Sequence, residues 1–241
     1  MHDSDTFGKV YLVGAGPGAV EYLTMRAYRL LTQADALVHD ALINPEIVTL
    51  VPQQCEIYDV GKRGGQPSTS QADINQRLVN LCQQGKQIVR LKSGDPFIFG
   101  RTTSEIQALR AAGCAFEVVP GLSSATVAPT IAHIPLTDPV LGSNFVVLTA
   151  HDLDRQNWEA LAQIATLVIL MGGRSLPAIS DRLLQQGKRP ETPVAVIRWA
   201  SQPQQQVWEG TLLNIAQRTK GANLSPCIIV IGEVVGLRPY L

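Results

Sequence analysis

The chain alternates short apolar runs with amphipathic stretches, and this alternation restricts its fold more than any other feature. Apolar runs of strand length occupy residues 9–13, 36–38, 87–91 and 116–119. Residues 22–33, 71–84 and 101–112 carry apolar side chains at helical spacing, and the last two stretches end at Gly85 and Gly113. Strands and helices that alternate in this way indicate an α/β fold with a largely parallel sheet over about the first 134 residues.

A second series of elements follows a segment rich in proline and glycine. Residues 135–143 contain Pro135, Pro139 and Gly142 and are predicted to be a linker. Strand-length runs then occur at 145–149, 167–170, 193–197, 206–208 and 227–231, with helical stretches at 158–164, 175–186 and 212–218. We therefore expect two α/β domains, residues 1–134 and 144–241, with a ligand cleft between them.

Composition excludes several classes of protein. Hydrophobic residues make up 45 % of the chain, and 20 Lys and Arg balance 20 Asp and Glu, so it is neither a disordered chain nor a basic nucleic-acid binder. The longest apolar runs, 166–171 and 227–231, are far shorter than the ~20 residues of a membrane-spanning helix, and the polar start predicts no signal peptide. Four scattered cysteines without metal-ligand spacing predict reduced thiols, no metal site and a cytoplasmic protein: Cys55, Cys82, Cys114 and Cys227.

A glycine-rich segment, GAGPG at residues 14–18, follows the first predicted strand. Glycines here let the backbone approach a ligand closely. A dinucleotide fingerprint needs its third glycine at position 19, where Ala19 stands, and Pro17 has no N–H for a pyrophosphate. Asp40 lies where such a site requires an acidic residue, so a nicotinamide site stays an alternative, as does a tight turn without a ligand. A Walker phosphate loop is excluded because the Gly-Lys-Ser/Thr ending is missing.

Further motifs occur in a fixed order along the chain. They are VHDALI (38–43), VGKRGG (60–65), VRLKSGDPFIFGR (89–101), VPGLSSA (119–125), IPLT (134–137), LMG (170–172), TPVAV (192–196) and GEVV (232–235). Together they resemble the tetrapyrrole methylases from about residue 9 to residue 238. The resemblance implies two α/β domains, a homodimer and S-adenosylmethionine as methyl donor, with S-adenosylhomocysteine as product.

The implied reaction methylates uroporphyrinogen III at C2 and C7 and yields precorrin-2, for sirohaem and cobalamin. A methyltransferase acting on a later precorrin and a catalytically silent tetrapyrrole-binding protein remain alternatives. No nucleic acid or membrane partner is expected.

The chemistry of this reaction asks for alignment and for proton transfer. A sulfonium methyl is already electrophilic, so the protein must mainly align the ring carbon with the S–CH3 bond. The methylated ring must then lose a proton, which favours a general base. The resemblance assigns Asp40 as proton acceptor and Lys62 as proton donor. Asp40 can also be a turn or helix cap, and Lys62 a solvated lysine, or Lys62 and Arg63 can hold substrate carboxylates.

Uroporphyrinogen III is a polyanion, so an electrically neutral protein must gather cations where this substrate binds. Arginine suits this because it binds carboxylates bidentately and stays charged. The resemblance places a substrate-binding and catalytic arginine at Arg101. A cation is disfavoured at the start of a helix, where Arg101 is predicted to lie, and a solvated arginine at a helix end is the alternative.

The resemblance also assigns residues to the methyl donor. These are Pro17, Ser93, Gly94, Asp95, Ile98, Ser123, Ser124, Met171 and Ala200. Ser123 and Ser124 can instead cap a helix, and Met171 can instead belong to the core.

The chain departs from the family pattern at several of these places. Ser93 stands for a glycine, Ala19 for an acidic residue, Pro67 for a histidine, Thr102-Thr103-Ser104 for Gly-Gly-Glu, Asp138-Pro139 for His-Arg, and Ala200-Ser201 for Gly-Thr. These differences leave open that the substrate is a different corrinoid precursor, or that the activity is reduced.

Overall fold

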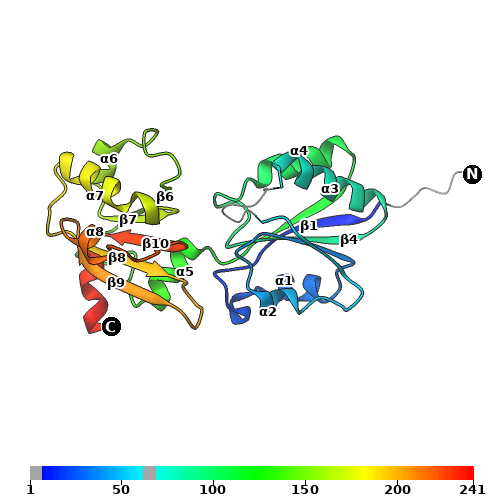
Figure 1. Ribbon diagram of the computed structural model, residues 1–241, viewed down its shortest axis with the longest axis horizontal. Coiled ribbons are helices and arrows are strands. Elements are labelled where there is room, and N and C mark those ends of the chain that lie inside the picture. Colours follow the sequence, from blue (N-terminus) through cyan, green and yellow to red (C-terminus); the bar gives the residue numbers. More distant parts are fainter. Residues whose placement is uncertain (1–6, 62–68) are drawn as a thin grey trace, which may run out of the picture. The chain divides into compact units, whose positions relative to one another are not determined.

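The protein folds into two compact units, each with its own sheet (Figure 1). The computed structural model describes residues 7–61 and 69–241. The first unit ends at Ser123, and the second comprises Ser124–Leu241. Helix α5 (Ser124–Ile131) packs against strands of the second unit, so this unit begins ahead of the predicted linker at 135–143. Within that linker, Asp138 and Gly142 form an isolated β-bridge.

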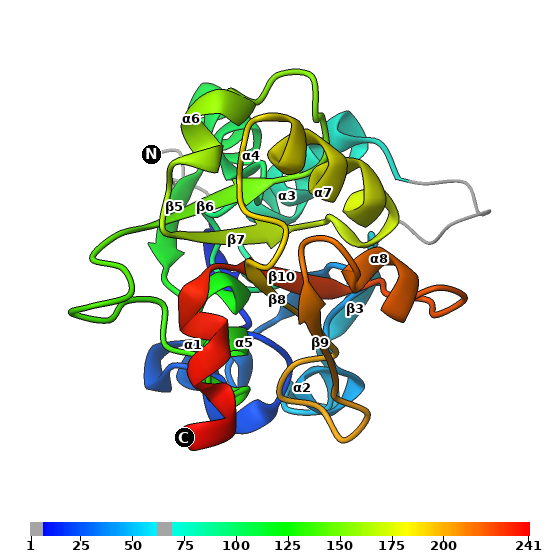
Figure 2. The same cartoon turned by 90° about the vertical axis from the view of Figure 1, so that its left-hand side faces the viewer.

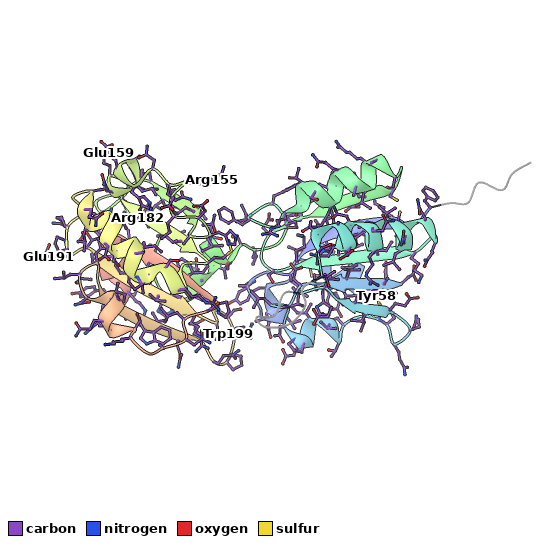
Figure 3. The ribbon with its side chains drawn as sticks, turned by 45° about the horizontal axis from the view of Figure 1, so that its top comes forward. Tyr58, Arg155, Glu159, Arg182, Glu191 and Trp199 are labelled. Carbon is purple, nitrogen blue, oxygen red and sulfur yellow. The ribbon has the colours of Figure 1, made fainter. Side chains whose placement is uncertain are left out.

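The described part of the first unit contains a five-stranded parallel sheet in the order β3-β2-β4-β1-β5. Its strands are β1 (Lys9–Gly14), β2 (Ala36–His39), β3 (Glu56–Asp59), β4 (Gln87–Lys92) and β5 (Ala115–Val119). The predicted parallel sheet is confirmed. The sequence did not reveal β3, because this edge strand is largely exposed and has no apolar run. Tyr58 on β3 (Figure 3) lies 4.5 Å from the Arg77 guanidinium, measured to the ring centroid.

Helices cover both faces of this sheet (Figure 1). They are the 3-10 helix η1 (Val20–Tyr22) and helices α1 (Met25–Leu31), α2 (Pro45–Val48), α3 (Gln71–Gln83) and α4 (Thr102–Ala111). Helices α1 and α2 lie on one face, and α3 and α4 on the other. The helix predicted at 22–33 begins only at Met25, because the Thr24 hydroxyl accepts a hydrogen bond from the Ala27 N–H (3.1 Å) and caps it there.

The second unit, all of which is described, has a sheet in the order β6-β7-β10-β8-β9. Its strands are β6 (Phe145–Thr149), β7 (Thr166–Leu170), β8 (Pro193–Arg198), β9 (Gln206–Thr211) and β10 (Cys227–Ile231). Only β6 and β7 run parallel, so this sheet is mixed. The connection from β8 to β9 is too short for a crossover helix, and a short connection joins neighbouring strands antiparallel.

Helices again lie on both faces of the second sheet (Figure 2). Helices α6 (Trp158–Ala162), α7 (Leu176–Gln185) and α8 (Ile215–Arg218), with the 3-10 helix η2 (Gly173–Ser175), cover one face; α5 and the 3-10 helix η3 (Glu233–Tyr240) cover the other. The helix predicted at 212–218 begins later, at Ile215. Asn214 Oδ1 accepts a hydrogen bond from the Thr211 N–H (2.9 Å) and shapes the turn before it. Every helix of the described chain falls short of the length and apolarity that a bilayer crossing needs.

Candidate active site

The predicted site residues of the first unit lie in loops at one edge of its sheet. Because the strands are parallel, their carboxyl ends share an edge, and loops follow β1, β2, β4 and β5 there. These loops carry Pro17, Asp40, Ser93, Gly94, Asp95, Ile98, Arg101 and Ser123. Lys62, Arg63 and Pro67 lie outside the described residues.

The loops after β1 and β4 meet where the sheet changes the direction of its connections. The chain leaves β1 for α1 on one face and leaves the neighbouring β4 for α4 on the other, and such a switch point is where α/β sheets usually bind ligands. Gly16 and Gly94 exchange backbone hydrogen bonds of 3.2 and 2.9 Å here. A Cβ atom on Gly121 would come within 2.3 Å of the Gly94 carbonyl oxygen. The glycines therefore permit three loops to pack on one another.

This geometry differs from that of a dinucleotide fingerprint. There, the glycine loop leads directly into the N-terminus of a helix, whose N–H groups hold the pyrophosphate. Here, η1 follows the loop and α1 begins only at Met25. The nicotinamide alternative therefore gains no support from the fold.

The turn after β4 joins the loops of two strands. Asp95 Oδ1 accepts a hydrogen bond from the Phe97 N–H (2.9 Å), and Asp95 Oδ2 accepts one from the Gly121 N–H (3.1 Å). Asp95 thus fixes the turn to the loop after β5. Ser93 Oγ is buried and has no hydrogen-bond partner among the described residues. A buried hydroxyl without a partner is uncommon in proteins, and it marks a place where a polar ligand atom fits.

The segment that follows combines apolar exposure with backbone strain. Phe97, Ile98 and Phe99 are exposed, although they are large apolar side chains. Phe99 (φ 54°) and Arg101 (φ 56°) adopt the left-handed conformation, which is uncommon for residues other than glycine. Strain of this kind concentrates at functional sites. Arg101 is exposed and immediately precedes α4, without capping it. This segment therefore presents an apolar surface beside a cation.

Asp40 follows β2 and makes an ion pair instead of a cap. Arg90 Nη2 donates a hydrogen bond to Asp40 Oδ1 at 2.6 Å. The Asp40 side chain is 34 % exposed, whereas that of Arg90 is 3 % exposed. Burial acts to lower the pKa of Arg90, but the charges of Asp40 and Glu105 outweigh it and raise this pKa above its usual value. The Asp40 side chain is therefore held by a buried and permanently charged group, the guanidinium of Arg90.

Two more charged side chains complete a buried cluster that the sequence analysis missed. Glu105 on α4 is fully buried and accepts hydrogen bonds from Arg90 Nε (3.0 Å) and Lys92 Nζ (3.0 and 2.9 Å). Burial and the Arg90 charge lower the pKa of Lys92, against the attraction of Glu105. The signal was present in the sequence: Arg90 and Lys92 alternate with Val89 and Leu91 inside an otherwise apolar strand, and lysine and arginine are rarely buried unless paired.

The predicted residues of the second unit also follow strand ends. Met171 follows β7 and Ala200 lies in the loop after β8; both strands are antiparallel to β10 between them, so both loops lie at the same edge. Met171 (φ 58°), Trp199 (φ 50°; Figure 3) and Ser201 (φ 66°) are left-handed. Met171 is 52 % exposed, so the alternative that it belongs to the core is wrong. Ser124 is the first residue of α5.

One departure from the family pattern has a local structural role. Asp138 Oδ1 accepts hydrogen bonds from the N–H groups of Val140 (2.8 Å) and Leu141 (2.9 Å). These backbone bonds, that of Leu141 foremost, lower the pKa of Asp138. Asp138 therefore stabilises a turn, where the family pattern has a histidine.

Comparison with known proteins agrees with this geometry. Residues 9–216 match the family of tetrapyrrole (corrin/porphyrin) methylases. The chain belongs to this family. The sequence-based resemblance and the mixed α/β fold with two sheets are thereby confirmed.

Among similar family members is the uroporphyrinogen-III C-methyltransferase of Synechococcus elongatus, which is 57 % identical over 233 residues, 97 % of this chain and 96 % of that protein. An S-adenosyl-L-methionine-dependent uroporphyrinogen III methyltransferase of Methanosarcina barkeri is 42 % identical over 99 % of this chain and 96 % of its own. The chain spans about half the length of the siroheme synthases it matches.

Solved structures of the family include uroporphyrin-III C-methyl transferase from Thermus thermophilus complexed with S-adenyl homocysteine. It has a TM-score of 0.83 and 33 % sequence identity, and the match covers 95 % of this chain and all of that one.

Proposed function

We infer that this chain is an S-adenosylmethionine-dependent C-methyltransferase that acts on uroporphyrinogen III. The observation that carries this inference is the 57 % identity to a uroporphyrinogen-III C-methyltransferase over nearly the full length of both proteins. We propose methylation at C2 and C7 to give precorrin-2, which serves sirohaem and cobalamin formation.

The described residues fit the methyl donor. Ser93 Oγ, a buried hydroxyl without a partner, offers a hydrogen bond at the switch point of the first sheet. S-adenosylmethionine supplies an electrophilic methyl group on a sulfonium sulfur. We propose that Pro17, Ser93, Gly94, Asp95, Ile98 and Ser123 of the first unit bind it. The family resemblance assigns Ser124, Met171 and Ala200 to the methyl donor as well. Since both Asp95 oxygens accept backbone N–H groups, Asp95 contributes mainly by fixing the turn.

Substrate binding is proposed for the strained segment after β4. Phe97 and Phe99 offer apolar surface for the macrocycle, and Arg101 offers a permanent cation for its carboxylates. Lys62 as proton donor and Arg63 as a carboxylate ligand extend this proposal beyond the described residues.

Asp40 is proposed as the proton acceptor. Its Oδ1 is held by Arg90, while its Oδ2 makes no hydrogen bond to the described residues. Oδ2 is therefore the oxygen that can take the proton which the methylated ring must lose.

The deciding experiment incubates the protein with methyl-labelled S-adenosylmethionine and enzymatically made uroporphyrinogen III. We expect a product that carries two labelled methyl groups, identified by mass spectrometry. Tight tetrapyrrole binding without methyl transfer would indicate a silent binding protein. Transfer only to a later precorrin would indicate the other alternative.

Arg101 has a matched control on the helix that follows it. Arg101→Ala is expected to raise the KM for uroporphyrinogen III and to lower turnover by roughly 10²-fold, because it removes a bidentate carboxylate anchor. Arg110 lies in the last turn of α4, beside the Phe116 ring, and Arg110→Ala removes the same charge at the far end of the helix. Equal effects of both substitutions would contradict the role of Arg101.

We also propose that the enzyme is a cytoplasmic homodimer, as the family resemblance implies. Sedimentation equilibrium of the purified chain is expected to give twice the chain mass of 26.1 kDa. A mass of one chain at micromolar concentration would contradict the dimer and leave the methyl-transfer proposal intact.

A further inference from the structure

Asp40 and three buried side chains form a cluster of four charged residues, connected by ion pairs in a fixed order. Asp40 and Glu105 are anions, Arg90 and Lys92 are cations, and the ion pairs connect them as Asp40–Arg90–Glu105–Lys92. Glu105 shares Arg90 with Asp40 and is itself neutralised by Lys92. The Asp40 carboxylate therefore receives only part of the Arg90 charge.

Geometry fixes Arg90 in this arrangement. Each of its three nitrogen atoms is engaged: Nε with Glu105 (3.0 Å), Nη2 with Asp40 (2.6 Å), and Nη1 with the carbonyl oxygens of Leu91 (3.2 Å) and Val38 (3.4 Å). A guanidinium bound on three sides cannot turn away from one partner without losing another. A change of charge at Glu105 therefore alters the electrostatic interaction between Arg90 and Asp40.

We propose that Glu105 and Lys92 are positioning residues that act on Asp40 through Arg90, by setting how much of the Arg90 charge reaches the Asp40 carboxylate. Their catalytic importance rests on the proposed function, in which Asp40 is the proton acceptor. Neither residue needs to touch the substrate, since Glu105 is fully buried and the Lys92 side chain is 3 % exposed.

Two substitutions of opposite sign separate this role from a structural one. Glu105→Gln removes an anion and leaves Lys92 uncompensated, so the Asp40 carboxylate is stabilised and titrates at lower pH. Lys92→Met removes a cation and leaves Glu105 uncompensated, so Asp40 titrates at higher pH. Each shift is expected to be at most about one pH unit, because the substituted charge reaches Asp40 through the connected ion pairs of one cluster. Loss of packing alone would move both variants in the same direction.

The titration can be read without any turnover. The full-length protein is labelled with 13C at its aspartate carboxyl groups, the signal of Asp40 is assigned with Asp40→Asn, and its chemical shift is followed against pH by NMR. Several described charged or titratable groups belong to the elements around Asp40: Arg90 and Lys92 on β4, Glu105 on α4, His39 on β2 and Asp59 on β3. Only Glu105 and Lys92 differ between the variants, so the other groups act equally in all of them.

A second ion pair in the same unit gives a matched control. Lys86 and Glu56 form a salt bridge at the amino ends of β3 and β4, whereas Asp40 follows the carboxyl end of β2. Glu56→Gln and Lys86→Met remove the same charges there and are expected to leave the Asp40 titration unchanged.

Opposed shifts in the two variants, absent from the controls, support the proposal; shifts of equal direction, or none, overturn it. If one single variant fails to fold, the other is compared with the charge-balanced double variant Glu105→Gln/Lys92→Met. The proposal expects the single variant to shift in its stated direction and the double variant to titrate within about half a pH unit of the unsubstituted protein. A single variant without a shift, or a double variant that shifts as far as the single one, overturns it.

The acid limb of the pH profile of kcat/KM is then expected to move with the NMR titration. If the NMR shifts are opposed but the protein transfers no methyl group to uroporphyrinogen III, the inference about the cluster still holds. The proposed function would then be the part that fails.

Discussion

The two units of the chain differ in what they bury as well as in the direction of their strands. The first unit has a parallel sheet and buries Arg90, Lys92 and Glu105. The second has a mixed sheet, and the polar residues described as buried in it are hydroxyl-bearing: Thr166, Ser180, Thr192 and Thr219. Burying a charge costs far more than burying a hydroxyl, unless a partner compensates it.

This difference separates the two units in the chemical groups that each can supply to a ligand. Parallel strands place several loops at one edge, and the charged cluster lies beneath the residue proposed to accept a proton. Both units have left-handed residues after strand ends, Phe99 and Arg101 in the first and Met171 and Trp199 in the second. Among the described residues, only the first unit adds a buried cluster of paired charges, which can adjust the reactivity of a carboxylate.

The largest expected effect concerns the stability of the first unit. Arg90→Met removes the cation between two carboxylates and is expected to lower the free energy of unfolding by about 3–5 kcal/mol. In the second unit Arg189 pairs with Glu233 at 2.6 Å, but the Arg189 side chain is 70 % exposed. Arg189→Met is therefore expected to cost no more than about 1 kcal/mol. Urea unfolding of both variants measures the contrast, and similar losses would remove the distinction between the units.

The next effect separates turnover from binding. Asp40→Asn keeps the size of the side chain but removes the base, so kcat is expected to fall roughly 10²-fold or more. Met171→Ala removes contact surface in the second unit and is expected to raise the KM for S-adenosylmethionine. Steady-state kinetics with both substrates varied measures the two changes. If kcat fell only in Met171→Ala, Met171 and not Asp40 would be the residue needed for turnover.

A smaller effect concerns alkaline pH and compares a buried thiol in each unit. Burial, reinforced by Cys114, raises the pKa of Cys82 to about 12, and burial raises the pKa of Cys227 to about 11. Both exceed the ordinary thiol value of 9.0. The folded state binds these protons more tightly than the unfolded chain does. The resulting stabilisation is complete below pH 9 and is lost as the pH rises through 11 for Cys227 and 12 for Cys82.

Unfolding measured at pH 8 and at pH 10.5 tests this expectation. Cys227→Ala and Cys82→Ala are each expected to reduce the loss of stability between the two pH values. An unchanged loss in both variants would show that other groups cause it.

The smallest expected effects compare two buried hydroxyls that lack partners among the described residues, Ser93 Oγ and Thr166 Oγ1. If Ser93 binds the methyl donor, Ser93→Ala weakens binding of S-adenosylhomocysteine several-fold, the loss expected for one hydrogen bond of about 1 kcal/mol. Thr166→Val in β7 replaces an unsatisfied hydroxyl by a methyl group, so it is expected to leave stability unchanged or to raise it slightly. Calorimetric titration and thermal unfolding measure the pair, and a neutral Ser93→Ala would contradict its role.

The periodicity of the sequence predicted most elements of the first unit, because buried parallel strands are continuous apolar runs and the helices between them are amphipathic. It missed β3, whose side chains are largely exposed, and it did not reveal that the second sheet is mixed. Strand direction depends on connection lengths and pairing partners, which periodicity does not encode.

The ordered motifs of the chain determined its family, and with it the candidate residues from Pro17 to Ala200. Only the tertiary structure revealed that Asp40 is paired with Arg90, that Arg90 is shared with Glu105, and that Lys92 balances Glu105. The reason is physical: the energy of a charge depends on its burial and on its neighbours in space. Asp40 is 50 residues from Arg90 along the chain, and Glu105 is 15 residues from Arg90 on a different element, so only the fold shows that they meet.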